Sequence, residues 1–201
     1  MIRSFLLPAT LILLLAGCSS VRETEPGRTA LEQLMFSTAA ERAVDRLPLK
    51  VPQAAKIFVD PAYAEGTDSK YLLALLRDRV LREGAYLTDD RAQADMVIEP
   101  RIGAMSVDRG KYLIGISNFD VPIPLTGDLS IPDIAIYKRD RQQGVIKVAL
   151  TSYDAKTGAL AQSLEPVYGF SRKTDWSAFF IFSWSDNDLM PEPEKEGWVG
   201  K

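Results

Sequence analysis

The chain of 201 residues has an ordinary globular composition, with 46% hydrophobic and 25% charged residues. It contains no histidine and one cysteine, which excludes a histidine-based catalytic triad, a histidine-ligated metal and an internal disulfide within this chain. The net charge of −3 argues against nucleic acid as a partner, because non-specific binding to nucleic acid depends on a basic surface.

The chain starts with the pattern of a secretion signal. Arg3 precedes an apolar run from Phe5 to Leu15, and this run at 1.5 Å per residue covers only about half of a ~30 Å hydrocarbon core. We therefore interpret residues 1–17 as a signal peptide rather than a transmembrane helix.

The end of that segment carries a lipid-attachment motif. Leu15, Ala16, Gly17 and Cys18 resemble the lipobox of bacterial lipoproteins. The resemblance implies a diacylglycerol on the Cys18 thiol, cleavage before Cys18 and an N-acyl lipid on the new terminus. Apart from these lipids we expect no cofactor. The alternative is a small buried cysteine in an ordinary signal peptide. Ser19 follows, where enterobacterial lipoproteins kept at the inner membrane have Asp, so the resemblance implies the periplasmic face of the outer membrane.

The next segments predict a tether and a helix. Residues 18–28 are polar and contain Pro26-Gly27, which is typical of a linker between the lipid and a folded domain. Thr29 to Leu47 shows capping-box spacing at its start and apolar residues at helical intervals, and the pattern stops before Pro48.

A strand–helix–strand unit follows. Residues 56–60 and 85–88 are apolar runs typical of strands, and residues 70–83 between them form one apolar stripe at helical spacing. A third strand is predicted over 96–102. The spacing indicates parallel pairing through a crossover.

The second half predicts antiparallel strands. The first expected elements are a hairpin turn at 108–110 with a returning strand over 112–116, and an irregular crossing or an edge extension over 117–132. Strands over 134–137 and 145–153 are expected around a polar turn at 138–144, followed by a hairpin turn at 154–158 with a strand over 159–164. The predicted fold class is a single α/β domain over 29–189, in which an N-terminal helix and a strand–helix–strand unit are followed by an antiparallel meander in one mixed sheet. Residues 190–201 are expected to be a flexible acidic tail.

Four stretches carry a resemblance to known families: residues 94–103, 132–139, 143–145 and 153–158. In this pattern the chain resembles uncharacterised lipoproteins of Gram-negative bacteria. In a second pattern, carried by residues 56–60, 83–86, 94–95 and 153–158, it resembles envelope lipoproteins with a TolB-N-terminal-like or anticodon-binding-like fold. Examples are activators of peptidoglycan synthases of the LpoB type and secretion lipoproteins of the CsgG type. The resemblance implies a fold and a location in the cell envelope, and it implies no known activity.

Acidic residues offer weak candidates for chemistry. Glu99, with Asp95 and Asp108 nearby in sequence, could act as general acid and base, but a solvated strand face explains the pattern better. Asp89-Asp90 and residues 186–188 lack the spacing of a calcium loop, so we interpret them as turn-capping carboxylates.

Two segments are candidates for contact with a partner. Lys138, Arg139 and Arg141 concentrate positive charge on one predicted loop, where they could meet a lipid headgroup, a glycan or an acidic protein, although a solvated hairpin tip is the plainer interpretation. The other segment, 176–184, holds five aromatic residues: Trp176, Phe179, Phe180, Phe182 and Trp184. It is interpreted either as an anchor facing a partner or a membrane, or as a terminal element that closes the core.

These observations favour a binding module over an enzyme. The expected function is that of a lipid-anchored periplasmic lipoprotein that docks a periplasmic or outer-membrane protein. One alternative is a carrier of a small molecule or lipid, with the apolar region from Ile114 to Ile134 as a cavity wall. A less favoured alternative is a hydrolase that uses carboxylates alone.

Overall fold

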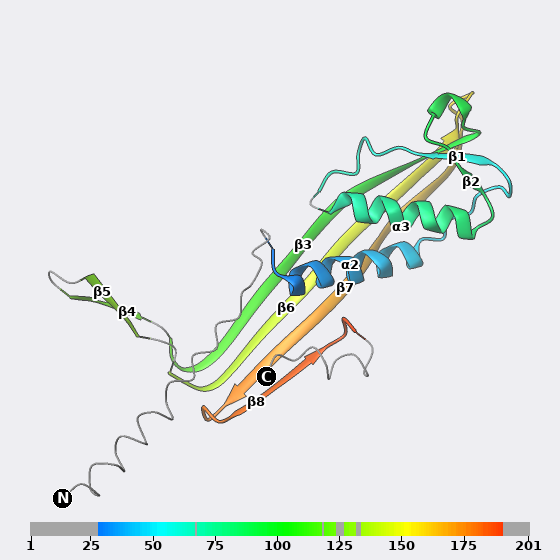
Figure 1. Cartoon of the computed structure of the whole chain (residues 1–201). Coiled ribbons are helices and arrows are strands. Elements are labelled where there is room, and N and C mark those ends of the chain that lie inside the picture. The colour runs from blue at the N-terminus through cyan, green and yellow to red at the C-terminus, as the bar shows by residue number, and fades with distance from the viewer. Residues whose placement is uncertain (1–27, 67, 118, 124–126, 132–133, 191–201) are drawn as a thin grey trace, which may run out of the picture.

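The computed structural model describes residues 28–190 except 67, 118, 124–126 and 132–133 (Figure 1). The segments predicted to be the signal peptide, the lipobox Leu15 to Cys18 and nearly all of the tether therefore lie outside the described residues, as does the tail from 191 onward. The helices are α2 (Ala30–Arg46), α3 (Ser69–Arg82) and the short 3-10 helix η1 (Arg91–Gln93). The strands are β1 (Lys56–Val59), β2 (Tyr86–Leu87), β3 (Met96–Ile116), β4 (Phe119–Ile123), β5 (Gly127–Ile131), β6 (Ile134–Asp154), β7 (Leu160–Ala178) and β8 (Phe182–Asn187).

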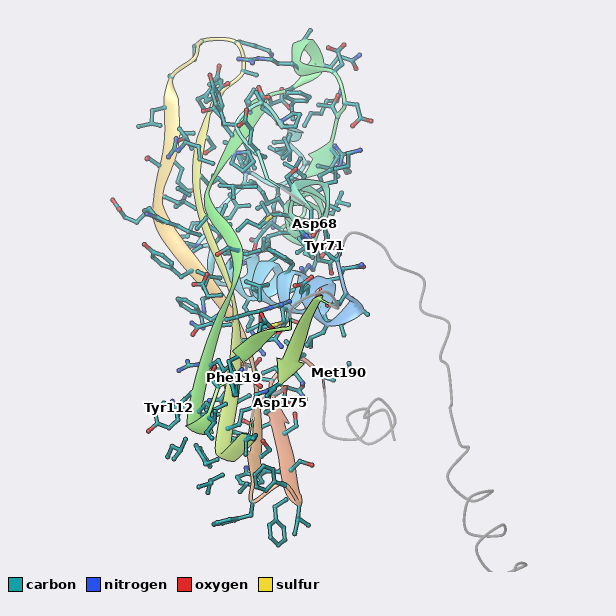
Figure 2. The ribbon with its side chains drawn as sticks, turned by 90° about the vertical axis from the view of Figure 1, so that its left-hand side faces the viewer. Asp68, Tyr71, Tyr112, Phe119, Asp175 and Met190 are labelled. Carbon is teal, nitrogen blue, oxygen red and sulfur yellow. The ribbon has the colours of Figure 1, made fainter. Side chains whose placement is uncertain are left out.

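One mixed sheet organises the domain, in the strand order β2-β1-β3-β6-β7-β8. Strand β1 pairs in parallel with β2 and β3, and the remaining pairs are antiparallel. Helices α2 and α3 lie side by side on the same face of this sheet (Figures 1 and 2). The predicted α/β class, with its N-terminal helix, strand–helix–strand unit and mixed sheet, is confirmed. Neither α2 nor α3, the longer helices of the described chain, is long and apolar enough to cross a bilayer.

Helix α2 begins and ends as its sequence predicts. The Thr29 side chain accepts a hydrogen bond from the Glu32 N–H (3.2 Å), and the Glu32 carboxylate accepts one from the Thr29 N–H (3.2 Å), which together form a capping box. The helix stops before Pro48. Its small residues Ala39 and Ala43 face the sheet and are fully buried.

Glycines on the sheet let α2 approach closely. A Cβ built on Gly169 would lie 1.8 Å from the Ala39 carbonyl oxygen, so only glycine fits beneath the helix at this position. Beside it, the buried Ser171 hydroxyl donates a hydrogen bond to the Met35 carbonyl (2.7 Å). Alanines on the helix and glycine on the strand therefore bring the two layers into backbone contact. The core between the layers comes from both helices and the central strands: Val44, Leu47, Ile57, Leu72, Leu76, Val80, Ile98, Ile146, Val148 and Leu150.

The three central strands are far longer than an ordinary strand. Strands β3 and β6 have 21 residues each and β7 has 19, so at about 3.3 Å per residue the sheet extends roughly 70 Å. The hairpin turn predicted at 108–110 and the polar turn predicted at 138–144 are both wrong, because β3 and β6 run through them. These two segments pair with each other, with Arg109 opposite Gln142 and Gly110 opposite Arg141. Their polar residues reflect a part of the sheet that lies in solvent rather than a reversal of the chain.

The remaining predictions of the meander have mixed outcomes. The segment 117–132 was expected to be an irregular crossing or an edge extension of the sheet, but its described part forms a separate antiparallel pair, β4 with β5. The hairpin turn at 154–158 is confirmed. There Asp154 accepts hydrogen bonds from the Thr157 N–H (2.7 Å) and hydroxyl (2.8 Å), which lower the pKa of this carboxyl. The strand after the turn does pair back on β6, but it continues to Ala178 instead of ending at 164.

Candidate functional site

One end of the sheet extends past the helices. The ion pair between Glu32, in the first turn of α2, and Arg109 of β3 marks where the cover of the helices ends. Beyond it lies the bare end of the sheet, which we define as residues 110–116, 134–141, 174–178 and 182–186. No helix of the described chain lies over either face of this bare end (Figure 1).

A row of aromatic and cationic side chains crosses all four strands of the bare end. Tyr112 of β3 lies opposite Arg139 of β6, which lies opposite Trp176 of β7, which lies opposite Trp184 of β8. Directly opposed residues of antiparallel strands project from the same face, so these four side chains form one row, which we call the aromatic row. The Trp176 and Trp184 rings stack with centroids 6.0 Å apart, and the Arg139 guanidinium lies 5.7 Å from the Tyr112 ring centroid.

The aromatic row projects from the face that the helices do not cover. Ser171 of β7 points toward α2, because its hydroxyl binds Met35. Side chains alternate along a strand, so Trp176, five residues further, points to the opposite side. Figure 2 shows Tyr112 directed away from the helices. Tyr112 is 51% and Trp184 is 49% exposed, so the open face presents large aromatic rings to solvent.

The other face of the bare end is polar. Lys138 pairs with Asp140 (3.2 Å), and Lys173 of the neighbouring strand pairs with Asp175, which lies directly opposite Asp140. Partly exposed ion pairs of this kind stabilise a fold by less than about 1 kcal/mol each and are typical of a solvated surface. The bare end is therefore two-sided, with a polar face adapted to water and an aromatic face that nothing in the described chain covers.

The turn between β7 and β8 lies at the far end of the sheet, and its apolar side chains are exposed. Phe179, Phe180, Ile181 and Phe182, which we call the tip, are 63%, 70%, 80% and 62% exposed. The Ile181 N–H donates to the Ala178 carbonyl (3.3 Å), and the Phe179 N–H donates to Ile136 on β6 (2.8 Å).

The backbone of the turn is strained. Phe179 and Phe180 have φ of 50° and 63°, a left-handed conformation that glycine and asparagine adopt far more readily than phenylalanine. Two phenylalanines thus occupy strained backbone positions with their rings directed outward, a pattern that is found at binding and functional sites.

The structure brings together residues that the sequence singled out separately. All five aromatics of 176–184 lie in the β7–β8 hairpin, and the exposure of the tip shows that its three phenylalanines do not close the core. Lys138, Arg139 and Arg141 lie within strand β6 rather than on a loop, and Arg139 lies directly opposite Trp176. Arg141, which donates to Gln143 (3.1 Å), shares the open face with Arg139, whereas Lys138 projects from the polar face.

Tyr112 of the aromatic row and its neighbour Tyr137 were not among the candidate residues predicted from the sequence. Their rings meet edge to face with centroids 6.2 Å apart, and both lie in segments predicted as short strands. The local signal in 112–116 was a run of residues that favour strands, which indicates a strand but not which face its tyrosine occupies.

The acidic candidates lie apart. Asp95 accepts a hydrogen bond from the Lys56 N–H (2.9 Å) just before β3 begins, whereas Asp108 lies thirteen residues further, roughly 40 Å away along the strand. Asp90 caps η1 by accepting from the Ala92 N–H (2.9 Å), and Asp188 binds Arg42 (2.9 Å). Among the described residues, no three metal-ligating side chains gather in one place.

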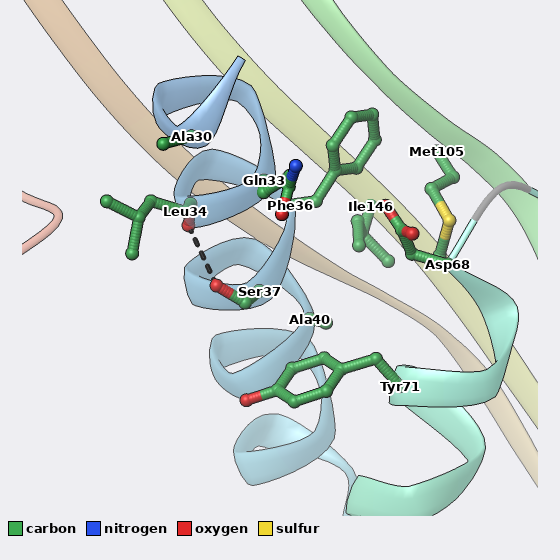
Figure 3. A pocket seen from close by; sticks show the side chains of 10 residues that line it. All are labelled: Ala30, Gln33, Leu34, Phe36, Ser37, Ala40, Asp68, Tyr71, Met105 and Ile146. Carbon is green, nitrogen blue, oxygen red and sulfur yellow. Dashed lines mark hydrogen bonds between the residues drawn. The ribbon is translucent and has the colours of Figure 1, made fainter. Parts of the chain in front are cut away.

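A separate cavity of about 520 Å³ lies between α2, α3 and the sheet (Figure 3). It is lined mainly by apolar side chains, among them Leu34, Phe36, Met105 and Ile146. The Tyr71 hydroxyl at its edge donates to Glu41 Oε1 (2.5 Å), and this bond, with burial and the negative charge of Glu41, raises the pKa of Tyr71 to about 12. Of the region from Ile114 to Ile134 that was predicted to form a cavity wall, Ile114, Ile116 and Ile134 are exposed on the bare end and do not line this cavity.

Comparison with known proteins places this architecture in a family. A protein-family model matches residues 12–168, well over half of the chain. The chain belongs to a family of unknown function (DUF6655). No curated protein matches it. The matched range begins before Leu15 and ends within β7, so it includes the segment predicted to be the lipobox and most of the long sheet. The rest of β7, the tip and β8 follow it.

Proposed function

We propose that this protein is a lipid-anchored, non-enzymatic binding module of the bacterial cell envelope. In this proposal the lipid on Cys18 holds the chain at the periplasmic face of the outer membrane, and the aromatic row holds a periplasmic or outer-membrane protein. The observation that carries the proposal is the contrast between the two faces of the bare end. One face is ion-paired and suited to water, while the other presents Tyr112, Trp176 and Trp184.

The composition of the row supports contact with another protein. Tryptophan, tyrosine and arginine are the residues that most often dominate the energy of protein interfaces, because they bury a large area and retain a polar group that can bind. Here they are held in one line by the register of four strands, and Trp176 and Arg139 are further ordered by their neighbours. A preordered row loses little conformational freedom on binding.

A crosslinked pull-down of the full-length chain from its native envelope tests the row. Trp184→Ser removes a half-exposed ring from the edge strand, and Tyr86→Ser removes a similarly exposed ring from β2 at the other edge of the sheet. The native chain and Tyr86→Ser are expected to enrich the same envelope protein, and Trp184→Ser is expected to lose it while keeping a folded circular-dichroism spectrum. Equal enrichment by all three chains would contradict the proposal.

The anchor has its own test. Cys18→Ala removes the thiol that the lipobox resemblance assigns to the lipid. The native chain should fractionate with membranes and gain the mass of a diacylglycerol and an acyl group, because two or more acyl chains hold a protein durably to a bilayer. If the mass of the native chain includes no lipid, the predicted lipid anchor on Cys18 is wrong.

The cavity under α2 supports a second candidate, a carrier of a small apolar molecule. Its volume of about 520 Å³ falls in the range of small-molecule sites. Native mass spectrometry of the full chain would show a co-purifying ligand if this candidate holds. Ala40→Trp, which fills the cavity from α2, should then abolish the extra mass, and a chain that is always empty would contradict it.

A further inference from the structure

We infer that the tip, residues 179–182, inserts into the surface of a lipid bilayer and sets the orientation of the domain on the membrane. The inference goes beyond the proposed capture of a protein, because it concerns the end of the sheet rather than its aromatic face. It rests on the proposed function only for the position of the lipid anchor.

The apolar end includes more than the turn. The ends of β3 and β6 lie beside the tip and present Ile114, Ile116 and Ile136, each about half-exposed. The Phe179 N–H bonds directly to the Ile136 carbonyl, which ties the turn to β6. The ends of β3 and β6 and the β7–β8 turn thus lie together and expose isoleucine and phenylalanine side chains.

Polarity changes in layers along the strands, counted from the tip. The first layer, at Ile136 and Phe179, is apolar. Three residues further along β6, about 10 Å away, lies the aromatic row, in which Arg139 stands among tyrosine and tryptophan. On the polar face, ion pairs begin at Lys138, at the level of the aromatic row, and continue through Asp140 and Asp175.

This order matches a membrane surface. Apolar side chains that enter the boundary between headgroups and acyl chains reach about 5–10 Å into it, and tryptophan, tyrosine and arginine are enriched at the level of the headgroups. A protein interface typically has an apolar centre surrounded by a polar rim. The gradient here instead runs in one direction, from the end of the sheet toward its middle. Arg139 and Arg141 on the open face supply positive charge at the level where the phosphates of anionic lipids would lie.

The start of the described chain lies on the same side of the molecule. Helix α2 begins toward the bare end (Figure 1), and its first turn is tied to Arg109, which pairs with Gln142 of β6. Gln142 is six residues, or about 20 Å, from Ile136 beside the tip. Ten residues, 18–27, connect Cys18 to the described chain and can reach at most roughly 35 Å. A lipid on Cys18 and the tip can therefore meet the same membrane surface.

Fluorescence quenching in vesicles tests the insertion. The full-length chain is reconstituted into vesicles of phosphatidylethanolamine and phosphatidylglycerol, with an environment-sensitive fluorescent amino acid at position 181. The matched control carries the same probe at position 156, in the exposed turn at the opposite end of β6, about 60 Å from the tip. Nitroxide lipids quench only probes that lie at the depth of the nitroxide.

The expected result is strong quenching and a blue-shifted emission at 181, with neither change at 156. The double variant Phe179→Asn/Phe180→Gly keeps residues that suit the left-handed turn and removes both rings, so quenching at 181 should fall to the level of the control. Equal quenching at 181 and 156, or unchanged quenching in the double variant, would overturn the inference.

The vesicles also separate this inference from the proposed function, because they contain no other protein. If the probe at 181 is shielded in native envelopes but not in pure lipid, the occupant of the tip is a protein and the inference fails. If self-crosslinking of chains at 181 replaces quenching, the occupant is a second copy and the inference fails as well. If the Trp184→Ser variant loses the captured protein, that result supports the role of the aromatic row and does not test the insertion of the tip.

Discussion

Trp176 and Trp184 lie directly opposite each other on β7 and β8 and stack with ring centroids 6.0 Å apart on the open face of the sheet. The pair joins the edge strand β8 to the long central strands and places a wide aromatic surface beside Arg139. It also explains how a short edge strand of six residues is held at the bare end, where no helix supports it.

The two tryptophans should therefore be energetically coupled. In a double-mutant cycle with Trp176→Ala and Trp184→Ala, measured by urea unfolding, we expect a coupling free energy of about 0.5–1.5 kcal/mol. Strictly additive effects of the two substitutions on the free energy of unfolding would show that the stacked pair does not hold β8 in place.

Replacing the strained phenylalanines of the turn should stabilise the fold. A left-handed conformation destabilises a residue other than glycine by about 1–2 kcal/mol, and the mostly exposed rings of Phe179 and Phe180 bury little area in return. Phe179→Asn/Phe180→Gly should raise the free energy of unfolding by about 1 kcal/mol or more, and thus the melting temperature by roughly 2–4 °C per kcal/mol. A lower melting temperature would mean that the rings support the fold.

The close packing of α2 on the sheet predicts a severe effect at Gly169. A methyl group there would overlap the Ala39 carbonyl oxygen and lie 2.8 Å from the Ala43 nitrogen, so the helix must move. We expect Gly169→Ala to lower the free energy of unfolding by about 3 kcal/mol. Gly110→Ala is the matched control on a bare strand, where a Cβ meets nothing within 4 Å, and it should change stability by less than about 0.5 kcal/mol. Similar effects at both positions would contradict the packing.

Tyr71 should make stability depend on alkaline pH. Its pKa is raised to about 12 in the folded chain, above the value of about 10 in an unfolded chain. The hydrogen bond to Glu41 therefore contributes fully below about pH 10, and its contribution disappears as the pH rises through about 12. Tyr71→Phe should lower the free energy of unfolding at neutral pH by at most about 1 kcal/mol, since the site is partly exposed, and the difference should vanish near pH 12. A difference that persists in strong alkali would assign the effect to packing.

Local patterns in the sequence predicted the covered part of the fold. The capping box at Thr29, the apolar stripe of α3 and the short buried strand at Ile57 are set by neighbours within a few residues, and the structure confirms all three. The length of β3 and β6 was not predictable in the same way. Asp108-Arg109-Gly110 has the composition of a turn, and only its pairing with residues 141–143 of β6 keeps it extended.

In the candidate site, too, the individual residues stand out locally, but their arrangement depends on pairing between distant strands. The aromatic residues of 176–184 and the cations of 138–141 each stand out in the sequence, yet Arg139 and Trp176 are neighbours only through the register of two strands. Tyr112 joins them from β3, a strand that was predicted to end before a turn at 108–110. The signal that remains local is the pair of phenylalanines in a turn, because phenylalanine is poorly suited to the left-handed backbone that a tight hairpin requires.

Hydroxyl-radical footprinting shows whether the aromatic row and the tip are covered in the cell envelope, as a binding surface must be. The full-length chain is oxidised in its native envelope and again after purification, and side-chain oxidation is compared residue by residue. We expect Tyr112, Phe180 and Trp184 to be protected in the envelope, whereas Tyr63 and Tyr86, which are 61% and 60% exposed away from the bare end, should react equally in both samples. Equal oxidation of Tyr112, Phe180 and Trp184 in the two samples would show that nothing covers this surface, and both the proposed capture of a protein and the insertion of the tip would then be wrong.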